Sequence, residues 1–239
     1  MNTRQFVLVS KDPRVTDSDL ATIARALRYQ LARHVAPAWE RSPWLVCHQN
    51  PALTIADDAI IFSLVNNDTA TPDALGWHTE DETGKVFGEI LISPVLDNGG
   101  TIIEGSNSVS SVVSHETIET FLDAAVSTWD QAADGNLYAH EGCDAVEGDS
   151  YVAQGVAVSN FLLPPFFDSQ APKGSKFDFL GNLTAPFTMS PGGYQAVMSG
   201  GTVTQVFDAH MPLWKRKAKA QSFRQQRRAA RVARATVAP

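Results

Sequence analysis

The chain has 239 residues, of which 44% are hydrophobic and 19% are charged, a composition typical of a soluble globular protein with one large domain or two small ones. No apolar run approaches the roughly 18–20 residues that cross a bilayer, and residues 1–10 lack the pattern of a secretory signal peptide. Cys47 and Cys143 are too few for a disulfide framework. We therefore expect a cytoplasmic protein with reduced thiols that does not enter membranes.

The net charge of −7 is unevenly distributed along the chain. Residues 211–239 contain nine Lys and Arg residues and no acidic residue, whereas residues 1–210 contain ten basic and all 26 acidic residues, for a formal charge of −16. The sequence therefore predicts an acidic domain at 1–210 and a basic segment at 211–239. The basic segment is rich in helix-forming Ala, Arg, Lys and Gln, so we expect it to be helical.

Two helices are predicted from apolar residues that recur at three- and four-residue spacing. The first pattern runs from Leu20 to Val35, after a capping Thr16 or Asp17 and before Pro37. The second occupies 109–125, in the middle of the chain. The helix at 109–125 is the one that carries the chemically informative residues.

Short apolar runs rich in β-branched residues predict strands before, between and after these helices. They lie at 6–9, 44–47, 59–65, 86–92, 195–198 and 202–207. We expect 6–9 to be an edge strand because a Lys-Asp-Pro turn follows it, and 86–92 to be the edge strand along which an extended substrate binds. Pro164 and Pro165 exclude a helix through 156–167, so the aromatic residues there belong to extended or loop structure. The order of elements predicts an α+β domain with a mixed sheet and a central helix.

The central helix contains the motif His115-Glu116-Thr-Ile-Glu119. Residues four apart project from one face of a helix, so the His115 imidazole and the Glu119 carboxylate can converge on one metal ion. Glu116 is offset by about 100° from His115, which would leave its carboxylate free to polarise a water molecule. The alternative is a hydrogen-bonded polar cluster that holds no metal.

An acidic, glycine-containing loop at 140–149 follows about 25 residues later and offers carboxylates for a third ligand. The same loop could instead be a solvated surface or a calcium site, although its spacing of Asp144, Glu147 and Asp149 does not match the regular calcium loop. Cys143 lies within it, and a lone buried thiol is the more common role for such a residue.

These motifs together resemble an H-E-x-x-E metallopeptidase-like family of bacterial and phage proteins. The resemblance rests on residues 114–123, Trp129 and 141–147, extends through 76–78, 158–164 and 185–194, and covers roughly residues 15–200. It implies a zincin-like fold that binds Zn²⁺ through His115 and Glu119, with Glu116 as the general base. We assign Asp144 as the third ligand, with Glu141 as the alternative.

Other residues have both a functional and a structural interpretation. His78 and Tyr194 could bind substrate or stabilise an oxyanion, but such residues more often form local hydrogen bonds. The aromatic segment 161–167 could line a substrate pocket, although we favour core packing for Phe161 and Leu163.

The first functional hypothesis is a zinc metallopeptidase that acts on peptides or proteins. The second is a phage virion structural or assembly protein of the capsid, neck or tail that keeps the zincin-like fold and docks through residues 211–239, onto virion proteins or further copies of itself. The third is a nucleic-acid-binding module, which the charge distribution restricts to the basic segment. An anionic surface or the acidic domain itself could also bind that segment.

Overall fold

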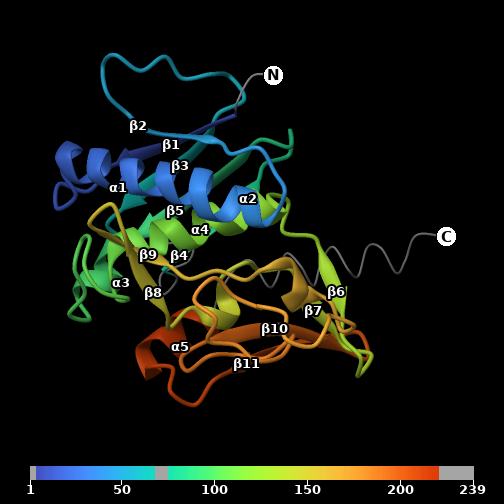
Figure 1. Ribbon diagram of the computed structural model, residues 1–239. Coiled ribbons are helices and arrows are strands. Elements are labelled where there is room, and N and C mark those ends of the chain that lie inside the picture. The colour runs from blue at the N-terminus through green and yellow to red at the C-terminus, as the bar shows by residue number, and fades with distance from the viewer. Residues whose placement is uncertain (1–3, 68–74, 221–239) are drawn as a thin grey trace.

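The computed structural model describes residues 4–67 and 75–220 of the chain (Figure 1). This part has the mixed helix and sheet content of the predicted α+β class. Its strands are β1 (Gln5–Ser10), β2 (Leu45–His48), β3 (Ile60–Val65), β4 (Gly76–Glu80), β5 (Val86–Leu91), β6 (Trp129–Gln131), β7 (Leu137–Ala139), β8 (Ser150–Ala153), β9 (Val156–Ser159), β10 (Tyr194–Ser199) and β11 (Thr202–Phe207). Its helices are α1 (Asp17–Gln30), α2 (Ala36–Ala38), α3 (Ile92–Leu96), α4 (Val109–Asp123) and α5 (Leu213–Ala220), with short π or 3₁₀ turns η1 (Leu31–Val35), η2 (Asp144–Val146) and η3 (Pro164–Phe167).

The first half of the chain forms a five-stranded sheet in the order β2-β1-β3-β5-β4. Strands β2, β1, β3 and β5 are parallel to their neighbours, and β4 pairs with β5 in the antiparallel direction. The prediction of β1 as an edge strand is wrong, because β1 lies between β2 and β3. The prediction of 86–92 as the edge strand is also wrong, since the unpredicted strand β4 lies outside β5.

Strand β1 shows why the turn after it is a poor guide to its position. Phe6 and Leu8 face the main core, whereas Val7 packs with Cys47 and Ala59 on the opposite face of the sheet. A strand that is apolar on both faces is typical of the interior of a parallel sheet. Pro13 lies beyond the last paired residue of β1, so it removes no hydrogen bond from the sheet.

Helix α1 begins where the sequence predicts, with a capping box between Thr16 and Asp19. Its helical path continues through the π turn η1 into α2, so it passes Pro37 instead of ending there. In the π turn the Ala36 amide donates to the Leu31 carbonyl, five residues back. This wider turn leads into α2, where Pro37 lies in the first turn, a position that tolerates a residue without an amide hydrogen.

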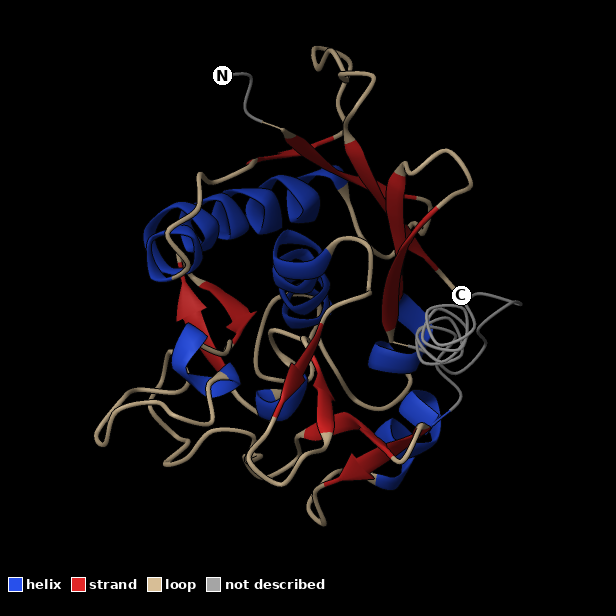
Figure 2. Ribbon diagram, turned by 90° about the vertical axis from the view of Figure 1, so that its right-hand side faces the viewer, coloured by secondary structure: helices blue, strands red, loops and turns tan. Residues whose placement is uncertain are grey.

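Helix α4 lies at the centre of the molecule (Figure 2). It contacts β4 and β5 of the first sheet as well as β9 of the hairpin β8-β9. The antiparallel sheet β11-β10-β7-β6 forms the other side of the molecule, and β10 also contacts η2 of the acidic loop. The central helix predicted at 109–125 is therefore confirmed, and it is enclosed by elements from before and after it in the chain.

The aromatic segment 161–167, which follows β9 and includes η3, contributes to the core. Phe161 is fully buried in the main cluster, while Phe166 packs in a smaller cluster with Leu162. Leu163 is only partly buried and packs against the main cluster. Core packing is thus the observed role of Phe161.

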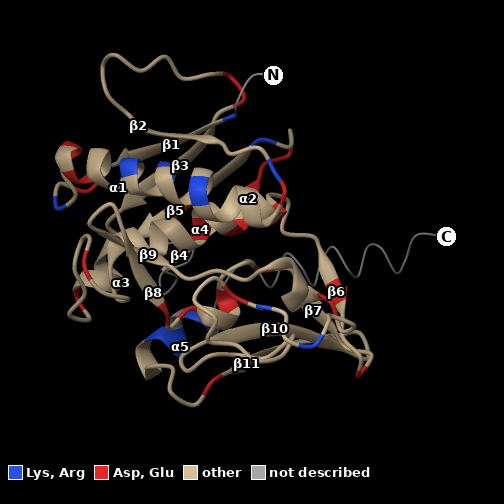
Figure 3. Ribbon diagram, viewed as in Figure 1, with Lys and Arg blue, Asp and Glu red and all other residues tan. Residues whose placement is uncertain are grey.

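The basic segment enters the described structure only as α5, which lies beside acidic positions of the acidic domain (Figure 3). Lys215 and Lys219 are buried, whereas Lys217 is exposed. Arg216 is half-buried, and the other five cations of the segment, at 224, 227, 228, 231 and 234, lie outside the described residues. Over residues 4–67 and 75–220, no helix is both long and apolar enough to cross a membrane.

Candidate metal centre

Helix α4 starts and ends at well-defined hydrogen bonds. At its start, Ser108 and Ser111 form reciprocal bonds between side chain and backbone. At its end, the Arg41 Nη1 group donates to the carbonyl oxygens of Phe121 and Leu122, at 2.7 and 3.1 Å. The Asp123 carboxylate accepts the two backbone amides that follow the helix, at 2.8 and 2.9 Å. These bonds hold the helix in one position and fix the direction in which its side chains project.

Nearly every side chain of α4 is buried, including many polar ones. A buried polar group that lacks a hydrogen bond costs about 1–3 kcal/mol, so each one needs a partner. Four of the hydroxyl groups donate hydrogen bonds to oxygen atoms. Ser110, Thr117 and Thr120 donate to the backbone carbonyl oxygens of Ala157, Val113 and Glu116, and Ser114 donates to the side-chain amide oxygen of Gln30. The charged side chains His115, Glu116 and Glu119 are instead grouped with charged or ionisable residues from other elements.

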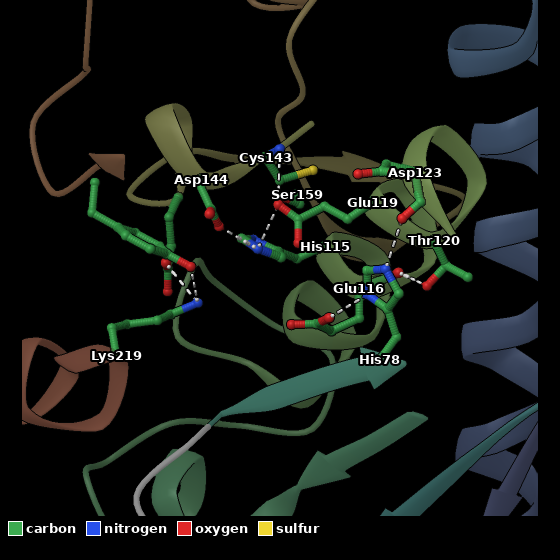
Figure 4. A network of polar contacts seen from close by, with 12 residues as sticks. His78, His115, Glu116, Glu119, Thr120, Asp123, Cys143, Asp144, Ser159 and Lys219 are labelled. Carbon is green, nitrogen blue, oxygen red and sulfur yellow. Dashed lines mark hydrogen bonds and ion pairs between the residues drawn. The ribbon is translucent and has the colours of Figure 1, made fainter. Parts of the chain in front are cut away.

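His115, Glu119 and Asp144 come together at one point (Figure 4). The His115 Nε2 atom lies 3.2 Å from Glu119 Oε1 and 3.1 Å from Asp144 Oδ1, and all three residues are at least 95% buried. The Cys143 amide donates to the same Glu119 oxygen at 3.3 Å, which links the helix to the acidic loop. The ligand set inferred from the sequence is therefore a spatial cluster, although His115 and Asp144 are 29 residues apart.

Two distances in the cluster are compatible with a tetrahedral metal site, although hydrogen-bonded ion pairs have similar lengths. Tetrahedral ligands with bonds of about 2.0–2.1 Å to zinc are about 3.3 Å from one another, close to the two distances measured here. One neutral imidazole and two carboxylates also balance the charge of a divalent cation. Without metal, burial acts to lower the pKa of His115, but the negative charges of Glu119 and Asp144 prevail and raise it to about 10. A proton on His115 and a divalent cation thus compete for the same two carboxylates.

Glu141, the alternative third ligand, lies apart from this cluster in the structure. Its side chain is buried and borders a separate cavity that Asp144 also lines.

The acidic loop is not a solvated surface, because Glu141, Asp144 and Glu147 are all at least 91% buried. Glu147 forms ion pairs with Lys215 and Lys219 rather than joining a set of calcium ligands. Cys143 is fully buried, and burial raises the pKa of its thiol well above the ordinary value.

Glu116 points to a second histidine, His78, on β4 (Figure 4). His78 Nδ1 lies 3.3 Å from Glu116 Oε2, and His78 Nε2 lies 3.2 Å from the Asp123 carbonyl oxygen. A carbonyl oxygen only accepts, so Nε2 carries a hydrogen and Nδ1 is the atom that faces Glu116. The bond from Nε2 orients the imidazole ring, and Nδ1 is the nitrogen that contacts Glu116, a role that the sequence analysis did not assign to His78.

Gly76 on β4 also helps to place Glu116. A Cβ atom at Gly76 would lie 2.8 Å from Glu116 Cγ, closer than carbon atoms approach in proteins. The glycine therefore lets the glutamate pass between β4 and α4. Gly76 and His78 are two residues apart, and alternate residues of a strand face the same side of a sheet. This spacing was the sequence signal that the two residues could face the same neighbour.

A small cavity opens beside His115 and Glu116. Its wall also includes Glu147 and Asp149 from the acidic loop, and Lys215 and Lys219 from α5. Tyr194, which we considered for oxyanion stabilisation, instead accepts a hydrogen bond from Lys219 at 3.3 Å. The start of the basic segment therefore lies next to the candidate metal centre.

Comparison of the chain with protein-family models, curated proteins and solved structures finds no match. The α+β class is confirmed by the structure. The zincin-like fold, the bound metal and the division at residue 210 remain predictions.

Proposed function

We propose that this protein is a zinc-dependent hydrolase of peptide bonds with a zincin-like arrangement of its central helix and edge strand. The observation that carries the proposal is the convergence of His115, Glu119 and Asp144 on one point, with Glu116 next to this group, in contact with His78 and beside a cavity. In this proposal the same helix supplies metal ligands and, from the position next to His115, a carboxylate that activates water, as metal-assisted hydrolysis requires.

In this proposal each residue has a defined task. Bound zinc would polarise the scissile carbonyl and make water more acidic. The Glu116 carboxylate takes a proton from the attacking water and gives it to the leaving amine nitrogen. His78 keeps this carboxylate aimed at the cavity and is a positioning residue. The burial of the cluster keeps bulk water away and strengthens these electrostatic effects.

The position of strand β4 is consistent with a peptide as the substrate. It is the outer strand of its sheet in the described part of the chain, and it carries His78 directly over α4. An extended peptide can add to such an edge through backbone hydrogen bonds. A peptide placed there would run beside the Glu116 side chain, where hydrolysis would take place.

Metal analysis of the purified full chain tests the proposal. We expect one zinc equivalent per chain, lost in His115→Ala and in Asp144→Ala. The Glu141→Gln variant is the matched control, because it changes a buried carboxylate of the same loop that lies outside the cluster, and it should keep the zinc. Loss of zinc in Glu141→Gln but not in Asp144→Ala would show that Glu141 is the third ligand.

The Glu116→Gln variant tests the catalytic role separately. It should keep its zinc and lose about 10²–10⁴-fold in the rate of peptide cleavage, the usual contribution of a general base. A protein without stoichiometric metal, whose cleavage of peptides does not change in Glu116→Gln, would contradict the proposal.

A further inference from the structure

Lys219 of α5 is buried in a pocket made of groups that bind ammonium ions. Its Nζ atom lies 3.0 Å from Glu147 Oε2 and 3.3 Å from the Tyr194 hydroxyl oxygen. The same nitrogen lies 4.8 Å from the centre of the Tyr194 ring, within the range of a cation–π interaction. A carboxylate, a hydroxyl and an aromatic ring thus surround the ammonium group of Lys219, a residue that is 6% exposed.

The position of Lys219 is unusual for a residue in such a basic segment. Lys217 on the same helix is exposed, as expected for a solvated cation, but Lys215 and Lys219 are four residues apart and turn together toward the acidic loop. Burial of a lysine is costly unless its charge is paired. Burial acts to lower the pKa of Lys219, but the surrounding carboxylates, Glu147 foremost, raise it above its ordinary value.

The pocket is continuous with the candidate metal centre. Lys219 and Glu147 line the same cavity as His115 and Glu116. Figure 4 shows Lys219 on the side of the centre where Asp144 lies. A ligand that reached the metal centre through this cavity would therefore pass the place that the Lys219 ammonium group occupies.

We propose that the pocket formed by Glu147 and Tyr194 is a binding site for a primary ammonium group, and that Lys219 fills it as an occupant from the same chain. The extension of this site to substrate rests on the proposed function: a lysine side chain of a peptide would take the place of Lys219 beside the metal centre. Helix α5 then limits access to the cavity until its lysine is displaced.

The contacts of Glu147 favour an ammonium group over a guanidinium group. Lys215 Nζ lies 3.7 Å from Glu147 Oε1, so this second oxygen already faces a cation. A guanidinium group binds best when both oxygens of a carboxylate are available. An ammonium group is a compact charge and needs only Oε2 and the Tyr194 hydroxyl, which are the two partners of Lys219.

Chemical rescue of the Lys219→Ala variant tests the pocket without relying on hydrolysis. The n-propylammonium ion carries the atoms that this substitution removes, and n-propanol is its uncharged match. Thermal unfolding of the full chain is measured after treatment with a chelator, in both compounds. We expect Lys219→Ala to unfold at a lower temperature than the wild type and to regain most of the loss in n-propylammonium but not in n-propanol.

The control variants separate the pocket from general effects of salt and charge. Lys217→Ala should resemble the wild type. The concentration of n-propylammonium that gives half-maximal stabilisation should be about ten-fold lower for Lys219→Ala than for the wild type or Lys217→Ala. The Lys219→Ala/Glu147→Gln variant should not be rescued. Because Lys215 could shift onto Glu147, the same titration is made in Lys215→Ala/Lys219→Ala, which should be rescued as well. If Lys219→Ala does not accumulate in folded form, the yield of refolding in n-propylammonium against n-propanol gives the same comparison.

The proposal would be overturned if n-propylammonium stabilised all variants equally. It would also be overturned if it stabilised neither Lys219→Ala nor Lys215→Ala/Lys219→Ala.

A separate experiment tests whether the pocket binds a lysine side chain of the substrate. Zinc-loaded Lys219→Ala should cleave a lysine-containing peptide about ten-fold faster than its norleucine analogue, and Glu147→Gln in this background should remove the preference. Rescue without cleavage would leave the ammonium site standing and contradict the hydrolase, whereas cleavage without rescue or preference would contradict only the ammonium site.

Discussion

Helices α1 and α4 pack against the same five-stranded sheet, but they differ in what they bury. Helix α1 turns Leu20, Ile23 and Leu27 toward the core and keeps most of its charged residues on the outside. Helix α4 is enclosed on nearly all sides and buries serines, threonines, His115 and glutamates together with its apolar residues. The polar residues of α4 therefore need partners from other elements, and the candidate metal centre consists of such partners.

The difference indicates that α1 contributes mainly to the stability of the fold, whereas α4 carries the residues proposed for function. Burial of apolar area on α1 lowers the free energy of the folded state directly. The charged cluster of α4 is costly to bury, so the fold must support it with hydrogen bonds, the Cys143 amide and the charges of α5. We expect changes on α1 to affect stability without changing the centre, and selected changes around α4 to do the opposite.

The largest expected effect is on stability, from Leu27→Ala on α1. Leu27 is 1% exposed, so the variant leaves a cavity and should lower the free energy of unfolding by about 2–5 kcal/mol. Urea denaturation measures this loss, and metal analysis should still find one zinc equivalent. Arg25→Ala on the exposed face of α1 is the control and should change stability by less than about 0.5 kcal/mol. Loss of zinc from folded Leu27→Ala would contradict the separation of the two helices.

The next effect should be on activity. In Gly76→Ala the added Cβ meets Glu116 Cγ at 2.8 Å, so the glutamate has to move. A displacement of about 1 Å can reduce the rate of catalysis about 10²-fold, and we expect a loss of this size in peptide cleavage with zinc retained. Thr79→Val, which changes the same strand without adding an atom beside Glu116, should keep most of the activity. Full activity of Gly76→Ala would show that β4 does not fix the position of Glu116.

Gln30 is the residue that connects the two helices, and its substitution should have a smaller effect. Its amide nitrogen donates to the Ser159 carbonyl at 2.9 Å, and its amide oxygen accepts from the Ser114 hydroxyl at 2.7 Å. Gln30→Leu leaves these buried groups without this partner, so it should lower the free energy of unfolding by about 1–3 kcal/mol.

A double-mutant cycle with Ser114→Ala measures the link between the helices. The two changes should be non-additive, because they remove the same hydrogen bond, with a coupling of about 0.5–3 kcal/mol. Additive effects would show that α1 and α4 are stabilised independently of each other at this point.

The predictability of the fold follows the same division between the two helices. The period of apolar residues identified α1 and α4, because burial on one face of a helix leaves a repeated pattern. Short apolar runs identified β1, β2, β3, β5, β10 and β11, whereas β6, β7 and β8 were not predicted. Strand β4 has the short sequence Gly-Trp-His-Thr-Glu, which shows no such pattern, and therefore it was missed. The order of strands in the sheet was also misjudged, since pairing depends on contacts between distant parts of the chain.

The candidate centre was predictable where its residues follow helical spacing. His115 and Glu119 are four residues apart on α4, and Asp144 follows from the acidic loop. His78 was not assigned to Glu116, because only the fold brings β4 over α4. The burial of Lys219 could not be inferred either, since the sequence around it consists of cations that suggest a solvated surface.

The smallest expected effect concerns α5, which combines the two types of helix by burying charged residues at the edge of the centre. Burial acts to raise the pKa of Glu147, but the charges of Lys219 and Lys215 prevail and lower it below its ordinary value of 4.5. A carboxyl group with a lowered pKa in the folded state stabilises the fold above the pKa of the unfolded state, and this stabilisation is lost as the pH falls through the lower value. Wild type should therefore be more stable than Glu147→Gln above about pH 4.5, and the difference should shrink as the pH is lowered further.

Urea denaturation of both proteins between about pH 3 and pH 7 measures this difference, and Lys219→Met provides the control. Without the Lys219 charge the pKa of Glu147 should be less depressed, so the advantage of Glu147 over Gln in the Lys219→Met background should be smaller and vary less with pH. If wild type and Glu147→Gln show the same dependence on pH throughout, the ion pair does not stabilise the docked helix. Helix α5 would then be held by its other contacts, such as the hydrogen bond from Gln205 Nε2 to the Lys219 carbonyl at 2.8 Å.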